Sequence, residues 1–470
     1  MASAIEECAI CYSDLKTQSY TINTCSHAFH NACLNAAAAA GTTTCPMCRG
    51  TIDAFLYNPA APVPPAPPMY ANDDPLPANN SFPTAEIFLK FYTEVNASEP
   101  VVEFDGIVEL TVSDEMTGER SGVDIIILAD ISGSMQGAKI NMLKKTISVM
   151  SGDFTDKDRM ALIAFDSYAT CIMPLKAMTE ANKAIAVAKA EELEVRDSTN
   201  IGAAFEMARQ ILEQRRFKNG VSAILLLSDG ADSYAMRAEA VTDVSRLAAI
   251  YSVGIGADHD SRLLSSVARI GKGSFSYAAD EPGIPESVGA TYGMLTSVVG
   301  TNAILKIPNR PPQTIGFLSL DEKKTFLFTT KSDAELTTTL EYNAPDAKGI
   351  EINRFLPTTA SEPVSEETLV LIDLTRNREL VAAAMKAAAD AVTKKAKEIL
   401  DDAKTKILAS KSKDHPHTAA LLKEINEALE APRDQATMIA RASQHAAQTG
   451  GMHMTPLGAM ASQSLRMRSA

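Results

Sequence analysis

The middle of the chain contains two patterns of apolar residues: continuous apolar runs, and apolar residues that recur every three or four positions. Four apolar runs that end in polar residues have the length and composition of buried strands, at 123–130, 158–167, 221–230 and 249–258. Amphipathic helices are indicated by apolar residues that recur every three or four positions over 141–154, 200–216 and 261–270. This alternation predicts a doubly wound α/β domain over residues 121–299, with a parallel sheet covered by helices on both faces.

The segments on both sides of this domain have strand composition. They are 86–95 and 101–112 before it, and 302–307, 314–320, 324–331 and 334–342 after it. We interpret 85–120 and 300–370 as one antiparallel β-sandwich, with the α/β domain inserted between its strands.

The pattern becomes helical from about residue 374. One apolar stripe steps by three or four residues from Val381 to Ile407, and a second helical stretch, 418–431, follows a break at His415–Pro416–His417. Residues 371–447 are therefore predicted to form an antiparallel helical hairpin, followed by a flexible tail over 448–470.

Proline is concentrated between residues 53 and 84, which hold nine of the 23 prolines. This composition favours an extended, semi-rigid linker. Within it, Pro67, Pro68 and Tyr70 fit the PPxY pattern that WW domains bind, so a WW-domain protein is a candidate partner. Because four residues in a proline-rich stretch often match by chance, a simple spacer remains the alternative.

Charge and hydropathy narrow the class of function. The net charge of −14 argues against a nucleic-acid partner, since phosphate contacts need clustered Lys and Arg. No apolar run approaches the roughly 18–20 residues that span a bilayer. The acidic start, MASAIEEC, lacks the apolar stretch of a secretory signal, so we expect a reducing, cytoplasmic setting.

Six of the seven cysteines lie before residue 50, interleaved with two histidines. The set has the spacing of two four-ligand zinc sites: Cys8, Cys11, Cys25, His27, His30, Cys33, Cys45 and Cys48. A segment as short as 1–52 buries too little apolar surface to fold alone, and zinc binding would supply the missing free energy. A different two-zinc fold or a redox cluster is the alternative.

This spacing resembles a RING finger of the RING-H2 type. The resemblance implies that one zinc is bound by Cys8, Cys11, His30 and Cys33, and the other by Cys25, His27, Cys45 and Cys48. It also implies a ubiquitin ligase that docks a ubiquitin-conjugating enzyme and positions its thioester without covalent chemistry. Ile10, Pro46 and Arg49 match the docking positions of the family, Arg49 being the cation that bridges ubiquitin and its carrier. One departure is Ala37, which stands where many active members have Trp.

The stretch DISGSM after the first buried run resembles the D-x-S-x-S signature of a von Willebrand factor A domain. The resemblance implies a magnesium site made by Asp130, Ser132, Ser134, Thr199 and Asp229. Asp130 and Asp229 each end a predicted strand, where ligands bind in such sheets. Hydroxyl and carboxylate oxygens suit magnesium, and a carboxylate from a partner protein could complete its coordination. Structural roles for these residues are the alternative.

The order of the motifs resembles the plant RING–von Willebrand A ubiquitin ligases of the wavy-growth type. The resemblance implies that the RING recruits the charged conjugating enzyme while the A domain binds the protein substrate. The rival interpretations are a non-enzymatic adaptor and a RING that works only beside a second, active one. We interpret the other histidines (259, 415, 417, 445 and 453) as surface or loop residues, and Cys171 as a buried apolar residue.

Overall fold

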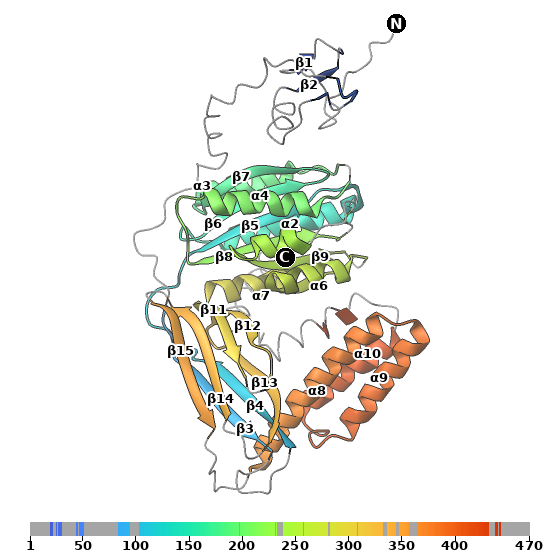
Figure 1. Cartoon of the computed structure of the whole chain (residues 1–470). Helices are drawn as coiled ribbons and strands as arrows, with labels where there is room; N and C mark the ends of the chain where they lie inside the picture. The colour runs from blue at the N-terminus through green and yellow to red at the C-terminus, as the bar shows by residue number, and fades with distance from the viewer. Residues whose placement is uncertain are drawn as a thin grey trace. The chain divides into compact units, whose positions relative to one another are not determined.

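The chain divides into two compact units, residues 1–69 and 70–470. The computed structural model describes residues 19–21, 25, 27–30, 44–45, 47–50, 83–94, 103–196, 198–230, 232, 238–256, 258–280, 283–307, 309–331, 336–344, 347–356, 364–431, 438–439 and 441–442. Residues 53–82 of the proline-rich linker, with the PPxY motif, lie outside these residues, as does the tail over 448–470. Each unit is described by itself below (Figure 1).

The first unit contains one short hairpin. Strands β1 (Ser19–Thr21) and β2 (Ala28–His30) pair antiparallel, with Tyr20 opposite Phe29. The Phe29 side chain is fully buried. A separate tight turn spans 45–50, where the Cys45 N–H donates to the Gly50 carbonyl (2.7 Å) and the Arg49 N–H donates to the Cys45 carbonyl (2.8 Å).

The centre of the second unit is a six-stranded sheet in the order β10-β9-β8-β5-β6-β7. Every residue of β5, β6 and β8 is buried, which explains their continuous apolar runs. The strand bounds are β5 Val123–Asp130, β6 Arg159–Phe165, β7 Ala169–Ala177, β8 Val221–Ser228, β9 Ala249–Ile255 and β10 Lys272–Ala278.

The expectation of a fully parallel sheet is wrong at one edge. Strand β7 pairs antiparallel with β6, so the sheet is mixed. Residues 166–168 alone connect the two strands. This connection is too short for the crossover that a parallel pair requires, and it makes a hairpin instead.

Helices cover both faces of the sheet, as expected for a doubly wound domain (Figure 1). Alternate residues of β5 enter different cores: Ile125 and Ile127 pack with α2, α3 and α7, whereas Ile126 and Leu128 pack with α4, α5 and α6. The helix bounds are α2 Ala138–Asp153, α3 Glu180–Glu191, α4 Ile201–Gln214, α5 Ala238–Val244, α6 Ser261–Ile270 and α7 Ile284–Thr296, with a 3-10 turn η2 at Gly133–Met135.

The flanking strands form two further sheets. One has the order β13-β4-β3 and the other β12-β11-β14-β15. Strand β4, before the α/β domain, pairs antiparallel with β13, after it, and the two sheets share one apolar core. The strand β15 was not expected from the sequence. The bounds are β3 Ile87–Thr93, β4 Glu103–Val112, β11 Val298–Lys306, β12 Gln313–Ser319, β13 Lys323–Lys331, β14 Leu336–Ala344 and β15 Ala347–Leu356.

The C-terminal region differs from the expected two-helix hairpin. Its described residues include the three helices α8 (Glu366–Ala389), α9 (Thr393–Leu408) and α10 (Pro416–Glu430), and residues 438–439 and 441–442 are also helical. Val392 adopts an extended conformation (ψ 150°), which ends the helical path in the middle of the predicted stripe. The stripe from Val381 to Ile407 is therefore divided between α8 and α9, which pack on one core with α10. None of the described helices is both long enough and apolar enough to cross a membrane.

Candidate metal centres

Four of the expected zinc ligands lie together in the first unit. Cys25 and His27 lie in the β1–β2 turn, and Cys45 and Cys48 lie in the tight turn at 45–50. One potential ligand atom from each lies within 4.8 Å of all the others. A tetrahedral zinc site with Zn–S bonds of about 2.3 Å separates its sulfur atoms by about 3.8 Å, so the four side chains fit one zinc ion.

The Cys45 thiol is prepared for metal binding by its surroundings. Burial opposes its ionisation, but hydrogen bonds from the backbone N–H groups of Cys48 and Met47, together with those from the Cys48 and Cys25 side chains, lower the pKa of Cys45 to about 7. The thiolate is the form that binds zinc, and a pKa near neutrality makes it accessible. The cluster contains the four residues that the RING resemblance assigns to one zinc.

The other expected RING positions are described less fully. Cys8, Cys11 and Cys33 lie outside the described residues, as do Ile10, Ala37, Pro46 and the side chain of His30. Arg49 is described and exposed. Its φ of 60° places it in the left-handed region, directly after the zinc-binding turn.

The second candidate centre lies at the carboxyl ends of two adjacent parallel strands. Asp130 ends β5, and Asp229 directly follows β8, its neighbour in the sheet. Ser132 is the N-cap residue of η2, and Ser134 lies within η2. The Ser132 N–H donates to Asp130 Oδ1 (2.9 Å), and Ser134 Oγ donates to Asp229 Oδ1 (3.0 Å) and lies 3.1 Å from Ser132 Oγ.

Thr199 is buried just before helix α4. Its loop is held at both sides: the Asn200 N–H donates to the Asp166 carbonyl after β6 (2.8 Å), and the Ile201 N–H donates to Asp232 Oδ1, three residues beyond Asp229 (3.3 Å). These bonds hold the loop at the same end of the sheet as Asp130 and Asp229.

The electrostatics of this centre favour a cation. Burial raises the pKa of Asp130 to about 6, against the hydrogen bonds from Ser132 and Ser228, and the negative charge of Asp229 adds to the increase. Two buried carboxylates beside three hydroxyl-bearing residues form a hard-oxygen donor set. The residues present therefore fit a magnesium ion.

Several residues around this centre were not found from the sequence. Lys139, in the first turn of α2, donates from Nζ to Asp229 Oδ2 (2.9 Å) and to Asp258 Oδ2 (2.9 Å). Ser228 Oγ donates to Asp130 Oδ2 (2.5 Å). Gly256 has a φ of +85°, and a Cβ there would lie 2.8 Å from Lys139 Cε, so the lysine passes close to the backbone. No motif marks these residues, because they are brought together by the fold.

His259 lies in the loop that joins β9 to α6, as expected, and its side chain is buried. Its Nδ1 lies 2.7 Å from the Gly256 carbonyl oxygen and its Nε2 lies 3.0 Å from Ser261 Oγ. The ring packs on Phe275 and Tyr277, so it fastens the loop that joins β9 to α6. Cys171 is half-buried, and burial raises the pKa of its thiol to about 11, which argues against a nucleophilic role.

Comparison with protein families identifies two parts of the chain. The ring finger domain model matches residues 6–49, and the von Willebrand factor type A domain model matches residues 124–288. The chain therefore combines an N-terminal RING zinc finger with a von Willebrand factor type A (vWA) domain.

The chain is homologous to curated proteins from Arabidopsis thaliana that are named as ubiquitin ligases. The E3 ubiquitin-protein ligase WAV3 is 34% identical over 113 residues, which cover 24% of this chain and 15% of that protein. The E3 ubiquitin-protein ligase WAVH1 is 25% identical over 300 residues, covering 48% of this chain and 43% of that protein. The chain thus spans less than half the length of either relative.

Two solved structures share the fold over a larger part of the chain. The ArnB paralog VWA2 from Sulfolobus acidocaldarius has a TM-score of 0.55 at 15% identity, covering 79% of this chain and 100% of that one. A von Willebrand factor type A protein from Catenulispora acidiphila has a TM-score of 0.54 at 17% identity, covering 75% of this chain and 91% of that one. The likeness in fold therefore extends beyond residues 124–288.

Proposed function

We propose that the protein is a RING-type ubiquitin ligase. The observation that carries the proposal is the cluster of Cys25, His27, Cys45 and Cys48, inside a matched RING finger and next to the exposed Arg49. The RING docks a conjugating enzyme charged with ubiquitin and holds the thioester in a reactive pose, with no covalent step on the ligase. Arg49 donates to ubiquitin and carrier together, and Ile10 and Pro46 provide the apolar contact.

The vWA domain is proposed to bind the protein substrate. Asp130, Ser132, Ser134, Thr199 and Asp229 would hold magnesium, which when bound supplies an open coordination position for an acidic side chain of the substrate. In this scheme the four ligands Cys8, Cys11, His30 and Cys33 hold the second zinc of the RING. The linker between RING and vWA domain raises the effective concentration of substrate near the thioester.

Three further assignments belong to this proposal. The two sheets with a shared core form one β-sandwich, into which the vWA domain is inserted. The protein acts in the cytoplasm, where its thiols stay reduced. A WW-domain protein binds Pro67, Pro68 and Tyr70.

Ubiquitin discharge tests the ligase activity. Wild type is compared with Arg49→Ala and with Arg246→Ala, a matched control whose side chain is exposed on the vWA domain. Across a panel of charged conjugating enzymes, we expect wild type and Arg246→Ala to accelerate discharge, and Arg49→Ala to lose most of the acceleration because the bridging cation is absent. No acceleration by the wild type with any carrier would contradict the proposal.

A non-enzymatic adaptor is the second candidate function. Ala37 favours it, since the chain has no Trp and the docking groove of the RING would be shallower. An adaptor would bind the substrate through the vWA domain and show no discharge with any conjugating enzyme.

The magnesium site is tested by thermal unfolding. Magnesium is expected to raise the melting temperature of wild type and not that of the double variant Ser132→Ala, Ser134→Ala, which lacks two hydroxyl ligands. At magnesium concentrations about 100 times the Kd, the stabilisation is about 2.7 kcal/mol. An equal response of the double variant would show that the site is assigned wrongly.

A further inference from the structure

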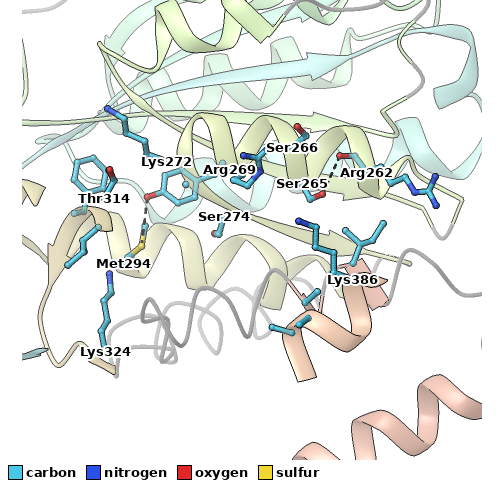
Figure 2. A pocket seen from close by; sticks show the side chains of 18 of the residues that line it. Arg262, Ser265, Ser266, Arg269, Lys272, Ser274, Met294, Thr314, Lys324 and Lys386 are labelled. Atoms are coloured by element: carbon cyan, nitrogen blue, oxygen red, sulfur yellow. Dashed lines mark hydrogen bonds between the residues drawn. The ribbon is translucent and has the colours of Figure 1, made fainter. Parts of the chain in front are cut away.

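A cavity of about 690 Å³ lies within the second unit, and neither Asp130 nor Asp229 lines it. Its walls come from the vWA domain (β9, α6, β10 and α7), from β12 and β13 of the flanking sheets, and from α8 with Ile439 and Ala442 (Figure 2). Lys272 begins β10 and pairs with Ile250 near the start of β9. The cavity therefore lies toward the amino ends of these strands, whereas Asp130 and Asp229 lie at the carboxyl ends of β5 and β8.

One part of the cavity wall is apolar. Tyr251, Met294, Phe317 and Ile439 contribute to it, and the Tyr251 hydroxyl lies 3.9 Å from Met294 Sδ. Ile439 packs against the vWA core and against the core of the C-terminal helices. A ligand in the cavity would thus contact several parts of the unit at once.

The other part of the wall carries an excess of positive charge. Five cations line it, Arg262, Arg269, Lys272, Lys324 and Lys386, against two carboxylates, Glu322 and Asp390. Each carboxylate already has a partner, because Lys324 lies 2.9 Å from Glu322 and Arg262 lies 3.4 Å from Asp390. Arg262 also donates to the Ala389 carbonyl (2.9 Å), which makes it part of the wall that joins α6 to α8.

Three cations are left over. Arg269, Lys272 and Lys386 form no ion pair with any residue in the described part of the chain, and all three are exposed toward solvent. Hydroxyl donors on Ser266, Ser274 and Thr314 line the same cavity. Figure 2 shows Lys386 extending from α8 toward the side of the cavity formed by α6 and β10. In a chain of net charge −14, three uncompensated cations around one cavity indicate an anionic ligand.

We propose that this cavity binds a small organic anion with an apolar body. Its carboxylate, sulfate or phosphate group is held by Arg269, Lys272 and Lys386, and its body packs against Tyr251, Phe317 and Ile439. The volume lies within the range of about 300–1,000 Å³ that is usual for small-molecule sites. Because the ligand joins the vWA domain to β12 and α8, its binding stabilises their mutual packing. The proposal does not depend on ligase activity.

The test uses the full chain and the fluorescent sulfonate 6-(p-toluidino)naphthalene-2-sulfonate as a probe. The wall variant is Arg269→Gln with Lys386→Gln. The matched control is Lys394→Gln with Lys397→Gln, which removes the same charge from two exposed lysines of α9. We expect saturable one-to-one binding by wild type and control, and about tenfold weaker binding by the wall variant, since two charge-assisted contacts are lost.

A neutral probe separates the charged contact from the apolar one. N-phenyl-1-naphthylamine is expected to bind wild type and wall variant equally, which also shows that the variant keeps the cavity folded. Equal binding of the sulfonate to wild type, wall variant and control would overturn the proposal, as would binding that does not saturate. Loss of both probes from the wall variant would show that its cavity has collapsed. In that case the single variant Lys272→Gln tests the proposal, which requires that this variant bind the sulfonate more weakly than wild type and bind the neutral probe equally well.

Discussion

Two aspartates at opposite ends of strand β5 are equally inaccessible to solvent but have different surroundings. Asp124 and Asp130 both have 0% exposure. Asp124 contacts two cations and one neutral amide. Arg159 donates to both of its carboxylate oxygens (2.8 and 2.7 Å), Arg215 Nη1 donates to Oδ2 (2.5 Å), and the amide Nδ2 of Asn219 donates to Oδ1 (2.8 Å). The chain itself compensates this charge completely.

Asp130 lacks such compensation in the described part of the chain. Its hydrogen bonds come from the neutral Ser132 N–H and Ser228 hydroxyl. Burial, with a further contribution from Asp229, raises the pKa of Asp130 to about 6. The comparison separates two kinds of buried carboxylate. Asp124 is neutralised by cations within the fold, whereas Asp130 is not, and this difference supports the proposal that Asp130 binds a cation from solution.

Removing the Asp124 carboxylate should have the largest effect on the stability of the vWA domain. Asp124→Ala leaves two buried arginines without their carboxylate, and we expect a loss of about 3–5 kcal/mol in the free energy of unfolding of the vWA domain. Because the chain has no Trp, hydrogen exchange of the peptide that covers β5 is the suitable measurement. It reads this domain without interference from the others.

The control for this variant is Glu206→Ala on the surface of α4. Glu206 pairs with Arg209 at 2.6 Å, but both side chains are well exposed (49% and 32%). Such pairs contribute about 0–1 kcal/mol, so protection of β5 should hardly change. Equal effects of the two variants would mean that the buried network is not what stabilises this end of the sheet.

Removing the charge of Asp130 should change the stability of the vWA domain in the opposite direction. In chelator at pH 7, Asp130→Asn is expected to stabilise the vWA domain by about 3 kcal/mol, since the pKa of Asp130 rises from 3.8 to about 6 and each pH unit of that rise corresponds to about 1.4 kcal/mol. In excess magnesium the order should reverse, because the variant has lost a charged ligand. Thermal and urea unfolding with and without magnesium measure both effects.

The pH dependence sharpens this prediction. The pKa of Asp130 is raised from 3.8 to about 6, so well below pH 3.8 the group is protonated in folded and unfolded chains and carries no penalty. Between about pH 4 and 6 the folded chain keeps a proton that the unfolded chain has lost, so wild-type stability falls as the pH rises. Asp130→Asn should lack this part of the dependence. A difference between wild type and variant that is the same at pH 4 and pH 7 would contradict the assignment.

The sequence predicted the features that are local. The vWA and RING assignments followed from short motifs, and β5, β6 and β8 were visible because strands buried on both faces are apolar throughout. The antiparallel edge strand β7 was missed, since its half-buried pattern is less apolar. The break at Val392 was missed because the stripe of apolar residues continues through it.

Other features depend on contacts between distant parts of the chain. Lys139 and Asp229 are 90 residues apart, and β4 pairs with β13 across the whole vWA domain. The cavity is assembled from three separate regions. Local periodicity indicates which residues are buried but says little about which buried elements pack against each other. The expected metal ligands could therefore be named from the sequence, whereas the residues that surround them could not.

The smallest predicted effects are changes in magnesium affinity caused by substitutions of Lys139, the cation beside Asp229, and of its partner Asp258. Lys139 contacts Asp229 and Asp258, so at the proposed magnesium site its ammonium would compete with the metal for Asp229. Lys139→Met keeps most of the apolar stem and removes the charge, so we expect magnesium to bind about three- to tenfold more tightly, as suits a partly buried charge pair. Titration calorimetry measures the change, and the exposed Lys189→Met is the control.

Asp258→Asn should act in the opposite direction and more weakly. The Asp258 side chain is 73% exposed, so solvent screens most of the effect of removing its charge. Of the two carboxylates that Lys139 contacts, only Asp229 remains in this variant. We expect magnesium binding to weaken by no more than about threefold. A change of the magnesium affinity in the same direction in both variants would show that Lys139 does not compete with the metal. The affinity would then be determined only by the uncompensated charge of Asp130 at this end of the strand.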